Sequence, residues 1–149
     1  MAIGDEFNSR DWPLHCTIAG VFALDLIDTL LDEFATVTAS HEAFQTATTD
    51  IDYFGPNESV KVRLLAMTEK LNNLHNDVVT FIEQNNGVFN EPHFLRQDFA
   101  PHITMRGEAP DKNGAIVFSQ LTLVDMFPDA DHTRRRVIAS FPLSTTQEQ

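Results

Sequence analysis

The chain has 149 residues, a length that fits one domain with a substantial hydrophobic core. Hydrophobic residues make up 42% of the sequence and charged residues 21%, which excludes wholesale disorder. The net charge is −12, with 22 acidic residues against 10 basic ones, and this argues against binding to long nucleic acid duplexes, because these are held by many Lys and Arg contacts to phosphates.

The sequence also predicts the compartment. The one cysteine, Cys16, excludes an intrachain disulfide and is typical of a reducing environment. Residues 1–6 are acidic and lack the apolar core of a secretory signal. The longest apolar stretch, residues 18–31, is interrupted by Asp25 and Asp28 and is too short to span a bilayer. We therefore expect a soluble, cytoplasmic protein that makes no membrane contact.

The first half of the chain alternates between strand and helix patterns. Residues 1–11 are mostly polar and predict no regular structure. Residues 14–22 are apolar and predict a strand, after which the apolar spacing becomes helical to about residue 38. Residues 43–54 are rich in Thr and aromatic residues and predict a second strand, which ends at the turn signal Gly55-Pro56-Asn57.

The second half repeats this alternation. The expected elements are a strand over 60–66, a helix from about 68 to the stop signal at 85–87, a loop over 87–97, the run 99–106, a polar turn over 107–114, strands over 115–125 and 135–143 joined by the loop 127–133, and a disordered tail over 144–149. About six strands with two helices between them predict a single α+β domain over residues 1–149, with its core at about 12–143.

Two short apolar runs, in opposite halves of the chain, carry the same His-x-Thr pattern. The first contains His15 and Thr17, and the second contains His102 and Thr104. Each His follows a proline by one or two residues. In a strand, residues i and i+2 point to the same face, so each run presents its His and Thr together. Two such strands beside one cleft would gather two imidazoles and two hydroxyls, a set suited to acid–base chemistry on a phosphate.

The other four histidines lack this context and are expected to be polar surface or loop residues: His41, His75, His93 and His132. Cys16 lies beside His15, but its side chain would point to the opposite face of a strand, which favours a buried cysteine over a nucleophile. A metal site at His15 and His102 is not expected, because neither motif has a further ligand at suitable spacing and Thr is a poor zinc ligand.

The two motifs and their surroundings resemble the 2H phosphoesterase superfamily, which includes 2′-5′ RNA ligase-like proteins and cyclic phosphodiesterases. The resemblance covers residues 12–143 and rests on the order of these features: the motifs at 15–18 and 102–105, a strand that ends in Phe54-Gly55, the alternating strand 60–66 followed by a helix, Pro101 before the second His, and the closing strand 135–143. Family members usually have a strand and a helix before the first motif. Here only eleven residues stand there, which leaves a sheet edge that a homodimer partner could cover.

The resemblance implies two pseudo-symmetric lobes of antiparallel sheet, with helices on the outside and a central cleft that carries both His-x-Thr strands. It implies a metal-independent hydrolase that needs no cofactor and acts on a 2′,3′-cyclic phosphate, a 2′-5′ linkage or a related cyclic nucleotide. His15 and His102 would be the acid and base, in an order that the sequence does not decide. Thr17 and Thr104 would donate hydrogen bonds to the non-bridging phosphate oxygens, where charge changes in the transition state.

Arg106 shares a face with His102 and Thr104 and is expected to bind the phosphate or a base, with a surface salt bridge as the alternative. Trp12 and Phe99 are the aromatic residues nearest the motifs and are expected to stack on a base, although most aromatic residues belong to the core. Tyr53 is a weaker candidate for the same role.

Arg134 and Arg136 would share a face at the start of the last strand. They could border the cleft or simply protect a sheet edge from aggregation.

The expected partner is a small phosphorylated nucleotide or an RNA end, bound by a monomer or a homodimer. A non-catalytic module that binds a nucleotide or RNA end on the same fold is the alternative function. In a third interpretation the motifs are a coincidence within an unrelated α+β domain. Neither the physiological substrate nor the direction of the reaction, hydrolysis or ligation, follows from the sequence.

Overall fold

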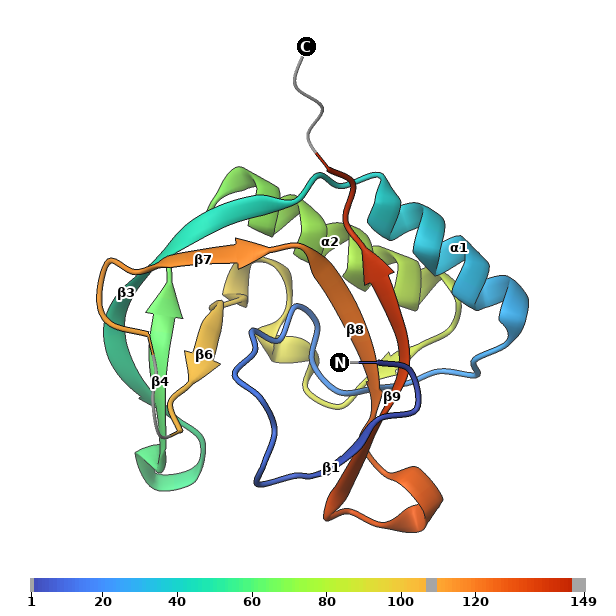
Figure 1. Cartoon of the computed structure of the whole chain (residues 1–149), viewed down its shortest axis with the longest axis horizontal. Helices are drawn as coiled ribbons and strands as arrows, with labels where there is room; N and C mark the ends of the chain where they lie inside the picture. Colours follow the sequence, from blue (N-terminus) through green and yellow to red (C-terminus); the bar gives the residue numbers. More distant parts are fainter. Residues whose placement is uncertain (1, 107–109, 146–149) are drawn as a thin grey trace.

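The computed structural model describes residues 2–106 and 110–145, which form an α+β fold of antiparallel sheets with two α-helices (Figure 1). The fold class predicted from the sequence is confirmed. The elements of these residues are β1 (Glu6–Asn8), β2 (Phe22–Ala23), α1 (Asp28–Ala39), β3 (Phe44–Phe54), β4 (Val60–Leu65), α2 (Glu69–Gln84), β5 (Val88–Phe89), β6 (His102–Thr104), β7 (Ala115–Phe118), β8 (Gln120–Asp125) and β9 (Arg134–Pro142). Short 3-10 turns are η1 (Pro56–Glu58), η2 (Pro92–Phe94), η3 (Arg96–Asp98) and η4 (Pro128–Ala130).

The strands form two main sheets, which occupy opposite sides of the view in Figure 1. One sheet has the order β6-β4-β3-β7, the other has the order β1-β9-β8, and a third, two-stranded sheet pairs β2 with β5. Only Ser119 separates β7 from β8, so the chain passes directly from one main sheet into the other. The segment that follows β1 links the two sheets, because β1 pairs with β9 and Cys16 forms an antiparallel bridge with Ile103 of β6.

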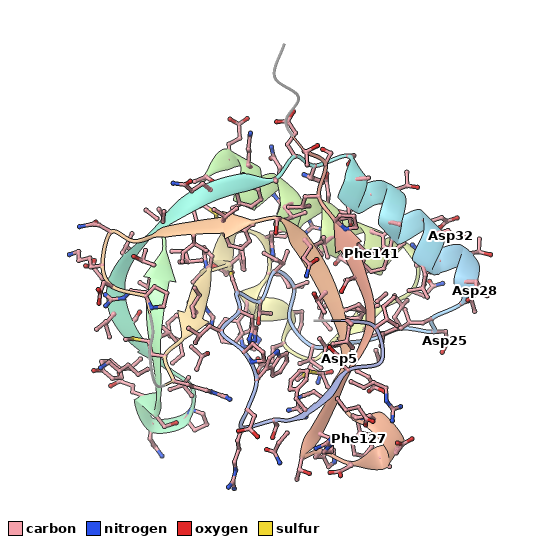
Figure 2. All side chains as sticks on the ribbon, viewed as in Figure 1. Asp5, Asp25, Asp28, Asp32, Phe127 and Phe141 are labelled. Carbon is pink, nitrogen blue, oxygen red and sulfur yellow. The ribbon has the colours of Figure 1, made fainter. Side chains whose placement is uncertain are left out.

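Helix α2 supplies most of the hydrophobic core. Its first turn is capped by Thr68, whose side-chain oxygen accepts a hydrogen bond from the Leu71 N–H at 3.2 Å. Its buried apolar side chains are Leu71, Leu74, Val78, Val79, Phe81 and Ile82. Helix α1 packs beside α2 and against β9. There Phe34 meets Phe141, which is labelled in Figure 2, edge to face with ring centroids 4.7 Å apart. Within the described residues, neither helix is long and apolar enough to cross a membrane.

The N-terminal half differs from the sequence prediction at three places. Helix α1 begins at Asp28 rather than directly after the first predicted strand, because the backbone of Ile27 is extended. Residues 14–22 do not form one strand: only Phe22 belongs to β2, and Cys16 pairs with β6 through a single bridge. The segment turns away after that bridge, because Ile18 is buried against the core. Residues 6–8, for which no regular structure was predicted, form β1 on the edge of β9 and satisfy backbone groups that the edge would otherwise leave unpaired.

The C-terminal half differs in three ways. The strand predicted over residues 115–125 is divided at Ser119, because its two parts belong to different sheets. The predicted loop over 87–97 contains β5 and two 3-10 turns. The predicted disordered tail begins with Ser144, which instead is ordered by hydrogen bonds from its N–H and its Oγ to the carbonyl of His41, at 2.9 and 3.0 Å. Residues 146–149, and residues 107–109 of the predicted polar turn, lie outside the described residues.

Candidate active site

The bridge between Cys16 and Ile103 brings the two His-x-Thr runs side by side. Because the pairing is antiparallel, His15 lies opposite Thr104 and Thr17 lies opposite His102. Alternate residues of extended chains point to opposite faces, so these four side chains share the face away from Cys16. The structure therefore brings together the four residues that the sequence singled out, although only the second run is a regular strand.

The two histidines of the runs have the same local hydrogen bond. His15 Nδ1 lies 2.8 Å from the carbonyl oxygen of Pro13, and His102 Nδ1 lies 2.7 Å from that of Ala100, in each case two residues earlier in the chain. A carbonyl oxygen only accepts, so each Nδ1 carries the proton and donates it. In a neutral ring the proton-accepting nitrogen is then Nε2. Nε2 of neither imidazole has a hydrogen-bond partner among the described residues.

Aromatic rings pack against both imidazoles. Trp12 stacks on His15, with ring centroids 4.3 Å apart and planes inclined by 20°. Phe54 at the end of β3 meets His102 edge to face at 4.7 Å. Burial lowers the pKa of His15 below its ordinary value, and the charges of Arg106 and His102 act in the same direction, whereas the bond to Pro13 opposes them. His15 is therefore mainly neutral at pH 7.

A basic pocket of about 440 Å³ opens beside this pair. Its lining residues are Ser9, Arg10, Trp12, Arg106 and Arg135. Two of the predicted substrate-binding residues, Trp12 and Arg106, thus line one pocket. Arg106 is anchored there through Nη1, which donates to the carbonyl oxygens of Ser9 at 3.0 Å and Arg10 at 3.4 Å.

The two arginines that the sequence singled out at the start of β9, Arg134 and Arg136, are not among the residues that line the pocket. Arg136 does not border the pocket, because it pairs with Asp129 at 2.6 Å and with Glu6 at 3.3 Å. Arg135, which the sequence did not single out, is the one whose side chain lines it. The guanidinium carbon of Arg135 lies 5.6 Å from the ring centroid of Trp12.

Phe99 is partly buried against the hydrophobic core. Its ring stacks on His75 with centroids 3.9 Å apart and packs against the hydrophobic core. This packing accounts for Phe99 without a bound base. Tyr53 lies half-exposed on β3. Among the described residues, its ring stacks on neither histidine of the motifs.

The sequence interpretation missed the structural role of His75, which was expected at the surface and is completely buried. Its Nδ1 donates to the carbonyl oxygen of Ile18, directly after Thr17 in the chain, at 2.5 Å. Its Nε2 accepts from the Arg96 N–H at 2.9 Å, in the turn before the second motif. His75 thus ties both motif segments to α2. One signal was present: His75 lies four residues after Leu71 and three before Val78, on the apolar face of the helix.

Cys16 packs on the core side of the bridge. Burial raises the pKa of its thiol to about 12, so the thiolate is scarce at neutral pH and Cys16 is not suited to act as a nucleophile. Within the described ranges, no three His, Cys, Asp or Glu side chains are placed to hold a metal ion together.

Comparison with known proteins gives the family. The family model of the 2′-5′ RNA ligase superfamily matches residues 5–138. The chain belongs to the 2′-5′ RNA ligase superfamily. That superfamily is the one the sequence resemblance indicated. No curated protein matches the chain significantly.

Solved structures agree in fold with this member of the 2′-5′ RNA ligase superfamily. The protein TT0787 of Thermus thermophilus has 18% identity and a TM-score of 0.54, over 90% of this chain and 80% of its own. E. coli LigT complexed with 3′-AMP has 16% identity and a TM-score of 0.55, over 90% of this chain and 78% of its own. E. coli LigT complexed with NADP+ has 16% identity and a TM-score of 0.53, over 88% and 76%. At these identities the likeness concerns the fold.

The environment of His75 predicts a pH-dependent stability. Burial lowers the pKa of His75 in the folded chain below its unfolded value of about 6.5, so the unfolded chain binds more protons as the pH falls. The free energy of unfolding should therefore decrease between about pH 7 and pH 5. His75→Asn keeps a donor for Ile18 but cannot titrate. We expect it to lower the stability at pH 7.5 by about 1–3 kcal/mol and to reduce the loss on acidification.

Urea denaturation at several pH values measures this effect, with His93→Asn as the control because His93 is exposed. A pH dependence of His75→Asn equal to that of the wild type would contradict the prediction.

Proposed function

We propose that the chain is a metal-independent phosphoesterase that hydrolyses a 2′,3′-cyclic phosphate, a 2′-5′ linkage or a related cyclic nucleotide. The observation that carries the proposal is the matched pair of imidazoles, His15 and His102, each with Nδ1–H bound to a carbonyl oxygen two residues earlier. This anchoring holds one ring tautomer in place and leaves one nitrogen per ring for the substrate. Membership of the 2′-5′ RNA ligase superfamily supports the reaction class.

In the proposed reaction a water molecule attacks phosphorus while one ring P–O bond of the cyclic phosphate breaks. His15 Nε2 accepts the proton of the water, a role that suits a histidine kept neutral by burial. His102, in its protonated form, donates a proton to the departing alkoxide. The product is a phosphate monoester, and the two rings then exchange protons with solvent to restore the starting state.

Thr17 and Thr104 donate hydrogen bonds to the non-bridging oxygens in this proposal. Their positions opposite the histidines in the antiparallel pairing support that role. Trp12 stacks on His15 and maintains the ring orientation.

The substrate is a small phosphorylated nucleotide or an RNA end, bound in the cytoplasm by a monomer or homodimer. The net charge of −12 disfavours longer polyanions. Two findings support a small nucleotide: the basic pocket beside the histidines, and the similar fold of E. coli LigT, which has been crystallised with 3′-AMP and with NADP+.

Replacement of either histidine tests the catalytic pair. We expect His15→Ala and His102→Ala each to lower kcat by about 10²–10⁴-fold, because each removes one proton-transfer group from the transition state. The measurement is turnover of a panel of 2′,3′-cyclic mononucleotides and 2′-5′-linked dinucleotides in excess EDTA. His93→Ala, at an exposed position, is the matched control. Wild-type turnover that disappears in EDTA would contradict metal independence, and binding without turnover of any compound would favour the binding module.

The pH dependence of turnover should be bell-shaped. The base must be neutral, and the pKa of His15 is lowered by its burial, so we expect kcat/KM to fall on the acid side only below about pH 6.5. On the alkaline side the rate should fall as the acid loses its proton. Rates of the preferred substrate between pH 4.5 and 9 measure both limbs. A flat profile from about pH 5 to 8 would count against catalysis by two histidines.

A further inference from the structure

The basic pocket beside the histidine pair stands out against the charge of the whole chain. Three of the ten basic residues, Arg10, Arg106 and Arg135, line it, and none of the described residues that line it is acidic. Figure 2 shows acidic side chains Asp25 and Asp28 at the outer end of α1, well away from the N-terminal segment that borders the pocket. The pocket is thus a local positive region on a protein that otherwise repels anions.

Four of the seven other basic side chains are paired with carboxylates in the described residues. Lys70 pairs with Glu42, Arg96 with Glu83, Lys112 with Asp50, and Arg136 with Glu6 and Asp129. Within residues 2–106 and 110–145, no carboxylate lies within salt-bridge distance of Arg10, Arg106 or Arg135. The pocket therefore keeps its positive charge available for an anion from outside.

Two of these guanidinium groups are held in place while part of each remains free. Arg135 Nη1 donates to the carbonyl oxygens of Met126, His132 and Arg134 at 2.8–3.0 Å. Arg106 is likewise anchored through Nη1. Neither residue uses Nη2 in a hydrogen bond to a described residue. An anchored guanidinium with spare donors is pre-organised to bind a phosphate.

The pocket lies close to the proposed reacting centre along the chain. Arg106 is two residues beyond Thr104, and Met105 between them still follows β4 through its N–H bond to the Lys61 carbonyl oxygen. Two residues of extended chain span about 6.6 Å. This spacing exceeds that of the oxygens of one phosphate and fits a second phosphate on the same ligand. Trp12 connects the two places, because its ring contacts both His15 and Arg135.

We infer that the pocket formed by Arg10, Trp12, Arg106 and Arg135 binds a second phosphate of the substrate, about one nucleoside unit from the phosphate that reacts. The inference rests on the proposed function, since it takes the histidine pair as the reacting centre. It narrows the substrate class to cyclic phosphates that carry a further phosphate, such as 5′-phosphorylated nucleoside 2′,3′-cyclic phosphates, short oligonucleotide ends or dinucleotides. Nucleosides with the cyclic phosphate alone leave the pocket empty and bind more weakly.

Binding can be measured without turnover, because Trp12 is the one tryptophan of the chain and lines the pocket. The probes are adenosine 3′,5′-bisphosphate and adenosine 3′-monophosphate, titrated against Trp12 fluorescence at low salt. We expect the bisphosphate to bind about tenfold tighter or more, since charge-assisted hydrogen bonds to its second phosphate are added. The preference should shrink at high salt, where exposed charges are screened.

Arg10→Gln is the decisive variant, because Arg10 is exposed and its side chain makes no hydrogen bond to a described residue, so the fold should be retained. We expect the preference for the bisphosphate to fall to about twofold or less. Arg134→Gln is the matched control, from the same strand as Arg135 but outside the pocket lining, and should keep the full preference.

Equal affinity for the two probes, no binding of either, or equal losses in Arg10→Gln and Arg134→Gln would each overturn the inference. Its failure is distinguishable from failure of the proposed function. A preference for the bisphosphate without turnover in EDTA refutes the phosphoesterase alone, and turnover without the preference refutes the second-phosphate site alone.

Discussion

A single antiparallel bridge, between Cys16 and Ile103, holds the two His-x-Thr runs next to each other. The first run comes from an irregular segment that no neighbouring strand supports along its length, so its position depends on this bridge and on packing behind it. That packing comes from α2, where His75 bonds to the carbonyl after the first run and to the turn before the second. The packing of α2 therefore helps to set the positions of both His-x-Thr runs.

The hydrogen bonds of the catalytic candidates and of His75 follow one physical rule. A buried or half-buried imidazole is stable when each ring nitrogen has a suitable partner, and a carbonyl oxygen fixes the proton on the nitrogen that faces it. In His75 both nitrogens are satisfied by backbone groups, which makes it a structural residue. In His15 and His102, Nδ1 is the one ring nitrogen with a hydrogen-bond partner among the described residues. The free nitrogen of each is what separates a reactive candidate from a packing residue.

Charge is the physical basis of the preference for small ligands that we propose. The chain carries −12 overall, yet the arginines around Trp12 have no acidic partners among the described residues. A long polyanion would contact the acidic surface as well as the pocket, whereas a compact ligand with one or two phosphates meets mainly the pocket. Repulsion of anions by the acidic surface and attraction of phosphate by the basic pocket therefore both favour a small ligand.

Much of the fold could be predicted from the sequence, because the strands β3 and β4 and the helix α2 have clear apolar periods. The pairing of the two motifs followed from their shared pattern and from the family resemblance. Contacts set by tertiary structure could not be predicted. The strand β1 depends on the edge that β9 offers. Neighbouring residues of β9 point to opposite faces, so that Arg135 lines the pocket while Arg136 pairs with Glu6 and Asp129, and the sequence does not show which face carries the pocket. His75 was missed because a polar residue on an apolar face indicates burial only when its partners are known.

The central claim is that His15 and His102 act together in one step, and the double variant tests it most directly. If both rings serve the same transition state, removal of the second ring after the first should lower kcat little further. The kcat of His15→Ala/His102→Ala should then lie close to that of the less active single variant. If the two losses multiply, the rings contribute independently, and the paired mechanism would be contradicted. Turnover of the preferred cyclic phosphate in EDTA by the wild type, both single variants and the double variant gives the answer.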